Sequence, residues 1–61
     1  MTRESDRERR ERKANAAEAW AGMWLHRGNL AAERGQRELA ERHYARAQTW
    51  LDQMNELRGN A

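Results

Sequence analysis

The chain has 61 residues with no cysteine and no proline, and its 12 basic residues nearly balance its 10 acidic residues. A chain this short forms one domain at most and buries only about 60% of the surface that its unfolded form exposes. Because it has neither disulfides nor a cluster of metal-ligating residues to add stability, we expect it to self-associate. The small excess of arginine permits a nucleic-acid partner without requiring one.

The residue types favour helix along the whole chain. Ala, Arg, Glu, Leu and Gln predominate while Val, Ile and Phe are absent, so we expect an all-α fold. No apolar run approaches the roughly 20 residues of a membrane span, and residues 1–13 contain no apolar stretch of the signal-peptide kind. We therefore expect a cytoplasmic protein with no membrane partner.

The first segment, residues 1–13, is almost wholly charged, and we expect it to form a helical extension. Part of its basic surface lies in line with Trp20 and Trp24 on a helical wheel. Arginine suits phosphate contacts, and arginine-rich helices order on RNA, so a small RNA- or DNA-binding regulator is one hypothesis. The residues that would contact nucleic acid are Arg3, Arg7, Arg9, Arg10, Arg12 and Lys13.

This basic run and the Ala-rich stretch after it resemble, over a short distance, the arginine-rich, boxB-binding peptide of lambdoid phage antiterminators. The other interpretation is a solvated helix stabilised by pairs such as Asp6 with Arg10, Glu8 with Arg12 and Arg7 with Glu11. The acidic residues would also repel phosphate. Both interpretations stay open at this point.

The middle segment predicts an amphipathic helix. Ala17, Trp20, Trp24 and Ala31 lie within about 60° of one another on a wheel of 100° per residue. Such a stripe of small and aromatic side chains is typical of a helix that packs against a second helix.

Residues 37–58 carry the clearest amphipathic repeat of the chain. Its apolar residues recur at spacings of four and three, which places them in one stripe of a helix. The stripe consists of Ala40, Tyr44, Ala47, Leu51 and Met54, with His43, Trp50 and Leu57 beside it. Together the two helices predict an antiparallel hairpin over residues 14–58, followed by a tail at 59–61.

Two positions could hold the turn between these helices. Gly28 followed by Asn29 has the chemistry of a helix end and a new helix start. Gly35 followed by Gln36 has a poorer cap, but a break there preserves the apolar stripes on both sides. We favour the turn at 35–36 and keep 28–29 as the alternative.

Over about residues 21–54 the chain resembles a single tetratricopeptide repeat, a helix-turn-helix unit of about 34 residues. The matching positions are Trp24, Gly28, Gly35, Ala40, Tyr44 and Ala47. Arg27, Ala31 and Asp52 depart from the pattern, since the family has large apolar or aromatic residues at the first two and a proline near the third. The resemblance implies a helical hairpin with close backbones at Gly28, Ala40 and Ala47, and it implies protein binding.

Three Trp residues are too many for a two-helix core to enclose. We therefore expect a partner surface, and a symmetric dimer that forms a four-helix bundle is the most economical solution. The leading hypothesis is a protein-protein interaction module that binds itself or another protein. The expected partner-binding residues are Trp20, Trp24, Tyr44, Trp50 and Met54.

Two further hypotheses remain, namely the nucleic-acid regulator and a structural or designed assembly subunit. His26 and His43 are far apart and have no Cys or convergent carboxylate at metal-ligand spacing, so no metal site is expected. No catalytic arrangement of Ser, His and Asp and no phosphate-binding loop can be identified. We expect a protein that is not an enzyme, with no cofactor and no small-molecule substrate.

Overall fold

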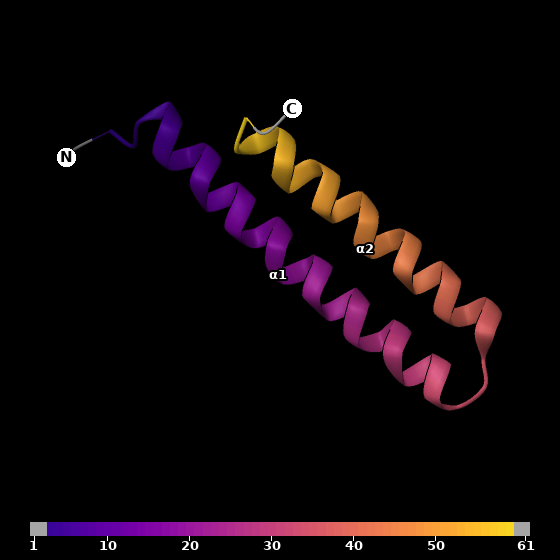
Figure 1. Cartoon of the computed structure of the whole chain (residues 1–61). Coiled ribbons are helices and arrows are strands. Elements are labelled where there is room, and N and C mark those ends of the chain that lie inside the picture. The colour runs from indigo at the N-terminus through magenta and orange to yellow at the C-terminus, as the bar shows by residue number, and fades with distance from the viewer. Residues whose placement is uncertain (1–2, 60–61) are drawn as a thin grey trace.

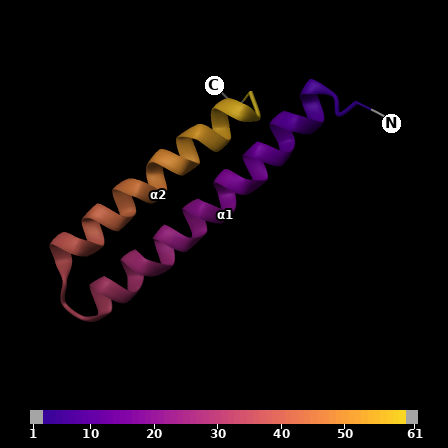
Figure 2. The ribbon, with the colours of Figure 1, turned by 180° about the vertical axis from the view of Figure 1, so that it is seen from behind.

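The computed structural model describes residues 3–59, which form two long helices and a short turn. Helix α1 spans Asp6–Glu33 and α2 spans Arg37–Leu57. The helices run antiparallel, and their ends at the N- and C-termini lie at the same end of the molecule (Figure 1). Seen from behind, they remain side by side along the whole of α2 (Figure 2). The predicted all-α helical hairpin is confirmed, and neither helix is long and apolar enough to cross a membrane.

The chain turns at Gly35, whereas α1 continues through Gly28 and Asn29 without a break. Gly35 has a φ of 75°, in the left-handed region that glycine adopts most easily. Its N–H donates to the Ala32 carbonyl (3.0 Å), and the N–H of Gln36 donates to the Ala31 carbonyl (2.9 Å). This pair of bonds is a Schellman motif, which satisfies carbonyls that the end of α1 leaves free. Gln36 makes no side-chain cap bond to α2.

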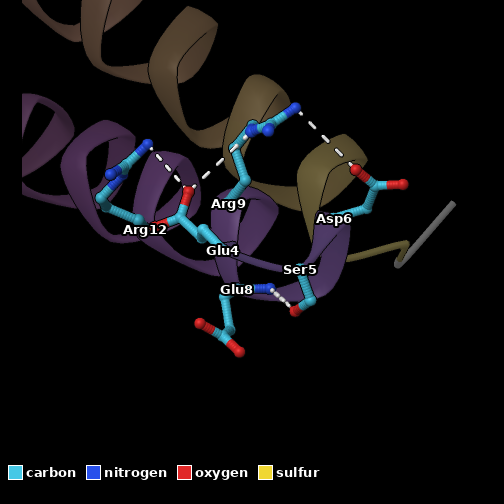
Figure 3. A network of polar contacts seen from close by, with 6 residues as sticks. All are labelled: Glu4, Ser5, Asp6, Glu8, Arg9 and Arg12. Carbon is cyan, nitrogen blue, oxygen red and sulfur yellow. Dashed lines mark hydrogen bonds and ion pairs between the residues drawn. The ribbon is translucent and has the colours of Figure 1, made fainter. Parts of the chain in front are cut away.

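The charged N-terminal segment is continuous with α1 from Asp6 onward. The Ser5 hydroxyl accepts a hydrogen bond from the Glu8 N–H (3.1 Å), and acidic side chains occupy the first turn (Figure 3). Ser5 and Glu8 have the spacing of a capping box, and this signal sets the helix start. The predicted extension is therefore helical from Asp6, and Arg3 precedes the helix. Residues 1, 2, 60 and 61 lie outside the described residues.

The core between the helices consists of small residues, and we call this line of contact the seam. Its members are Ala14, Ala17, Ala21, Gly28 and Ala31 on α1 and Ala40 and Ala47 on α2. Ala14, Ala21 and Gly28 are spaced by seven residues, as Ala40 and Ala47 are on α2. This heptad spacing is typical of helices that pack at a small crossing angle. No large side chain among the described residues is fully buried.

Gly28 is the point on the seam where a side chain would fit least. A Cβ atom there would lie 2.5 Å from Cε1 of Tyr44, whose ring covers the glycine. The resemblance to a tetratricopeptide repeat implied close approach at Gly28, Ala40 and Ala47, and all three residues are buried in the seam. By contrast, Trp20 was expected within the buried stripe of α1 but is 50% exposed, because the buried stripe is centred on Ala14, Ala21 and Gly28.

We predict opposite effects of the same substitution at two helical glycines. Gly22→Ala should raise the free energy of unfolding by about 1 kcal/mol, because nothing lies within 4 Å of the new methyl group and alanine favours helix. Gly28→Ala should lower it by about 1 kcal/mol, since displacement of the Tyr44 ring outweighs the same gain in helix propensity. Urea unfolding followed by circular dichroism measures both.

A second Gly28→Ala variant, made in a Tyr44→Ala background, serves as the control. Without the ring the new methyl group has room, so the substitution should become stabilising. Equal effects of Gly28→Ala with and without Tyr44 would contradict the proposed close contact.

Candidate functional site

Trp20 of α1 and Trp50 of α2 stack on one another beside the seam. Their ring centroids are 6.1 Å apart and the ring planes are inclined by 24°. Trp20 remains half exposed and Trp50 is partly exposed. Aromatic rings of this size contribute most to binding when a second surface covers them. The stacked pair therefore forms an apolar platform that the hairpin itself leaves open.

Trp24 lies beside the Ala seam and is surrounded by cationic and imidazole groups. The His43 ring is 5.3 Å away between centroids, and the Cζ atoms of Arg27 and Arg46 lie 5.1 and 5.0 Å from the Trp24 ring centroid. These are cation-π distances. We call the surface formed by Trp20, Trp24, His43 and Trp50 the Trp face.

The guanidinium groups of Arg27 and Arg46 have no carboxylate partner among the described ion pairs. The positions three and four residues away on each helix explain this, because none of them is Asp or Glu. Both cations at Trp24 are therefore available to an acidic group from outside the hairpin.

His43 carries an unsatisfied polar atom at this face. Its Nδ1 atom is buried and has no hydrogen-bond partner within the described residues. A buried nitrogen without a partner costs about 1–3 kcal/mol. The buried Nδ1 atom of His43 therefore lowers the stability of the hairpin.

Tyr44 lies on the opposite side of the seam from the Trp face. On the wheel of α2, Tyr44 and Trp50 are about 120° apart, with Ala40 and Ala47 between them. The Tyr44 hydroxyl donates to Oδ1 of Asn29 (2.6 Å), which joins the two helices on that side. The expected partner-binding set had placed Tyr44 on the same surface as the three Trp residues. In the structure Tyr44 lies on a different surface.

Met54 follows Ala47 by seven residues, so it continues the seam toward the open end of the hairpin. It is partly exposed there. Of the five expected partner-binding residues, only Trp20, Trp24 and Trp50 form one surface.

Arg58 holds the end of α2 against α1, on the same side of the seam as Tyr44. Its Nη2 donates to Oδ1 of Asn15 (2.8 Å) and Oε2 of Glu18 (2.9 Å), and its Nε lies 3.7 Å from Oε1 of Glu11. The sequence analysis did not identify Arg58. The available signal was its position, fourteen residues after Tyr44 and thus on the same flank of α2.

The six basic residues expected to contact nucleic acid are not equally available. Arg9 lies 3.8 Å from both Glu4 and Asp6, and Arg12 lies 3.0 Å from Glu4 (Figure 3). None of these is one of the three pairs that we expected. Asp6 and Arg9 have the i, i+3 spacing of a helix, whereas Glu4 precedes the helix and folds back over its first turns. Arg7 and Arg10 lie at the open end of the hairpin, around a shallow depression with Leu57 and Arg58.

No family model matches the chain, and no curated protein and no solved structure was found to be similar to it. Within residues 3–59, no three His, Asp or Glu side chains are grouped so that they could hold a metal ion. The candidate site is therefore defined by the geometry of the Trp face alone.

We predict that His43→Leu raises the free energy of unfolding by about 1 kcal/mol, because it removes a buried nitrogen without a partner and keeps a side chain of similar volume. His26→Leu is the matched control, since His26 is exposed and its replacement should change stability by less than about 0.5 kcal/mol. Thermal and urea unfolding of both variants test this. A loss of stability in His43→Leu would mean that the imidazole contributes more through Trp24 than its nitrogen costs.

Proposed function

We propose that this chain is a small protein-protein interaction module that buries its Trp face against a second protein surface, which is either another copy or a different protein. The observation that carries the proposal is the stacked pair of Trp20 and Trp50, left open on a hairpin whose buried residues are only Ala and Gly.

The exposed area of the chain supports this proposal. A compact monomer of 7.2 kDa exposes about 4,100 Å². The hairpin exposes 5144 Å², so it carries roughly 1,000 Å² more than a compact fold of its mass. A stable protein interface buries about 800 Å² per partner. The excess is thus of the size that one interface would cover.

The small residues of the seam also support the proposal, because they limit the stability of the isolated hairpin. Methyl groups bury little apolar area, and no large described side chain is fully enclosed. A surface that covers the Trp rings would add the burial that the hairpin lacks. Binding would then also stabilise the fold, since a ligand that binds only the folded state shifts the unfolding equilibrium.

The alternative of a nucleic-acid-binding N-terminal helix has weaker support. Two of its six basic side chains are paired with carboxylates, and Glu8 and Glu11 lie on the same turns. The resemblance to a tetratricopeptide repeat agrees with the protein-binding proposal but adds no independent observation to it.

The proposal predicts self-association of the isolated chain at high concentration, through the Trp face. Sedimentation equilibrium over a wide concentration range should show a mass that rises with concentration. Trp20→Gln should abolish the rise while the helical circular dichroism spectrum is kept, because Trp20 is half exposed and lies outside the buried seam.

Leu25→Gln is the matched control for Trp20→Gln. Leu25 is 40% exposed but lies on the other side of the seam, so its replacement should leave the association unchanged. A wild-type chain that stays monomeric at every concentration, with Trp fluorescence fully protected from a soluble quencher, would contradict the proposal.

A further inference from the structure

We propose that the partner of the Trp face is an amphipathic helix with acidic flanks, supplied by a different protein. This inference rests on the proposed function and deepens it by assigning the chemistry of the partner. It rests on the distribution of charge around the seam, the excess exposed area of the chain and the contacts that the Trp rings make.

From Lys13 onward, the carboxylates of the hairpin are absent from the Trp side of the seam. The positions of that side carry Lys13, Arg27 and Arg46. On the Tyr44 side lie Glu11 and Glu18, which are held by Arg58. The remaining carboxylates of the hairpin, Glu33, Glu38, Glu41, Asp52 and Glu56, lie on the outer sides of the helices or on the Tyr44 side.

A partner for this face must therefore combine apolar side chains with negative charge. Its apolar side chains would cover the Trp20 and Trp50 rings, while its carboxylates would meet the unpaired guanidinium groups of Arg27 and Arg46. Bidentate pairing of Arg with carboxylate gives such contacts their orientation.

A helix is the partner shape that fits two parallel ridges. α1 and α2 lie side by side, so a third helix along the Trp face would complete a three-helix bundle (Figure 2). Its apolar residues would recur at i, i+3, i+4 and i+7, as in other helices that dock on helical surfaces. The excess surface of the whole chain, roughly 1,000 Å², is large enough to include the area that one docked helix of a few turns covers.

A second copy of the chain is a less suitable partner for this face than an acidic helix. In a symmetric dimer the same patch is present on both sides, so two positively charged Trp faces would be brought together. No carboxylate of the Trp side would compensate them. Self-association through this face is therefore opposed by charge repulsion, and salt should strengthen it by screening that repulsion.

Single-stranded nucleic acid is also a less suitable partner for this face than an acidic helix. Proteins that bind it present several aromatic rings on which successive bases stack. Here Trp20 and Trp50 already stack on each other, and the Trp24 ring is occupied by Arg27, Arg46 and the His43 ring. The face thus offers no series of separate rings on which successive bases could stack.

The test uses three labelled probes against the full chain, with binding followed by fluorescence anisotropy. The first is a synthetic amphipathic helix with Leu at the spacing above and Glu on its flanks. The second has Lys in place of every Glu, and the third is a uridine oligoribonucleotide of matched charge. We expect the acidic helix to bind at least about tenfold more tightly than the other two.

Two charge reversals on opposite sides of the hairpin then locate the site. The Arg27→Glu, Arg46→Glu double variant should weaken binding of the acidic helix about tenfold and strengthen binding of the basic helix. Arg37→Glu is the control, because Arg37 is exposed on the Tyr44 side, and it should leave both affinities within about twofold. Added salt should weaken acidic-helix binding and strengthen self-association.

The outcomes separate this inference from the proposed function. Equal or tighter binding of the basic helix, lost in Trp20→Gln, would overturn the acidic partner while the protein-docking function stands. Tightest binding of the oligoribonucleotide, or binding of no probe at all, would also overturn the inference. The docking function itself fails if Trp20→Gln changes neither the concentration-dependent mass of the isolated chain nor the binding of any helix probe.

Discussion

The close approach of two helix backbones along a line of Ala and Gly is the constraint on which the rest of this structure depends. Gly28 lies directly under the Tyr44 ring, and the Ala residues of the seam leave no room for larger side chains between the helices. Backbones that pack this closely exclude the aromatic rings from the interior. The Trp and Tyr side chains must therefore lie on the flanks, where the hairpin covers them only in part.

That exclusion gives the hairpin two unlike sides. On one, Tyr44 and Arg58 use polar bonds to α1 residues and close the contact between the helices. On the other, Trp20 stacks on Trp50, and two guanidinium groups that no described carboxylate neutralises lie over Trp24. The first side satisfies its own polar groups, whereas the second leaves both apolar area and positive charge without a complement. Such an uncompensated combination is typical of an interaction surface.

Stability and binding are linked in a chain of this size. A hairpin with a core of methyl groups gains little from apolar burial, and its folded state has little stability in reserve. A partner that covers the Trp face would add burial where the hairpin has least. The unsatisfied nitrogen of His43 lies at the same surface. The features that weaken the isolated hairpin are thus concentrated where a partner would bind.

The sequence by itself determined the helices and the turn near Gly35, because helix propensity and the continuity of the apolar stripes on both sides of the turn can be read along the chain. The close approach at Gly28, Ala40 and Ala47 was expected from the resemblance to a tetratricopeptide repeat. The start of α1 also has a local signal, the capping-box spacing of Ser5 and Glu8, which the sequence analysis did not identify. Only the tertiary structure decided which side of the seam each aromatic residue occupies. A wheel of α1 alone does not distinguish the stripe of Ala14, Ala21 and Gly28 from the neighbouring one that contains Trp20, since both are apolar. The contact with α2 is centred on Ala14, Ala21 and Gly28 and also buries Ala17 and Ala31. Trp20 is left exposed at the edge of this contact, and Arg58 reaches Glu18 across the hairpin.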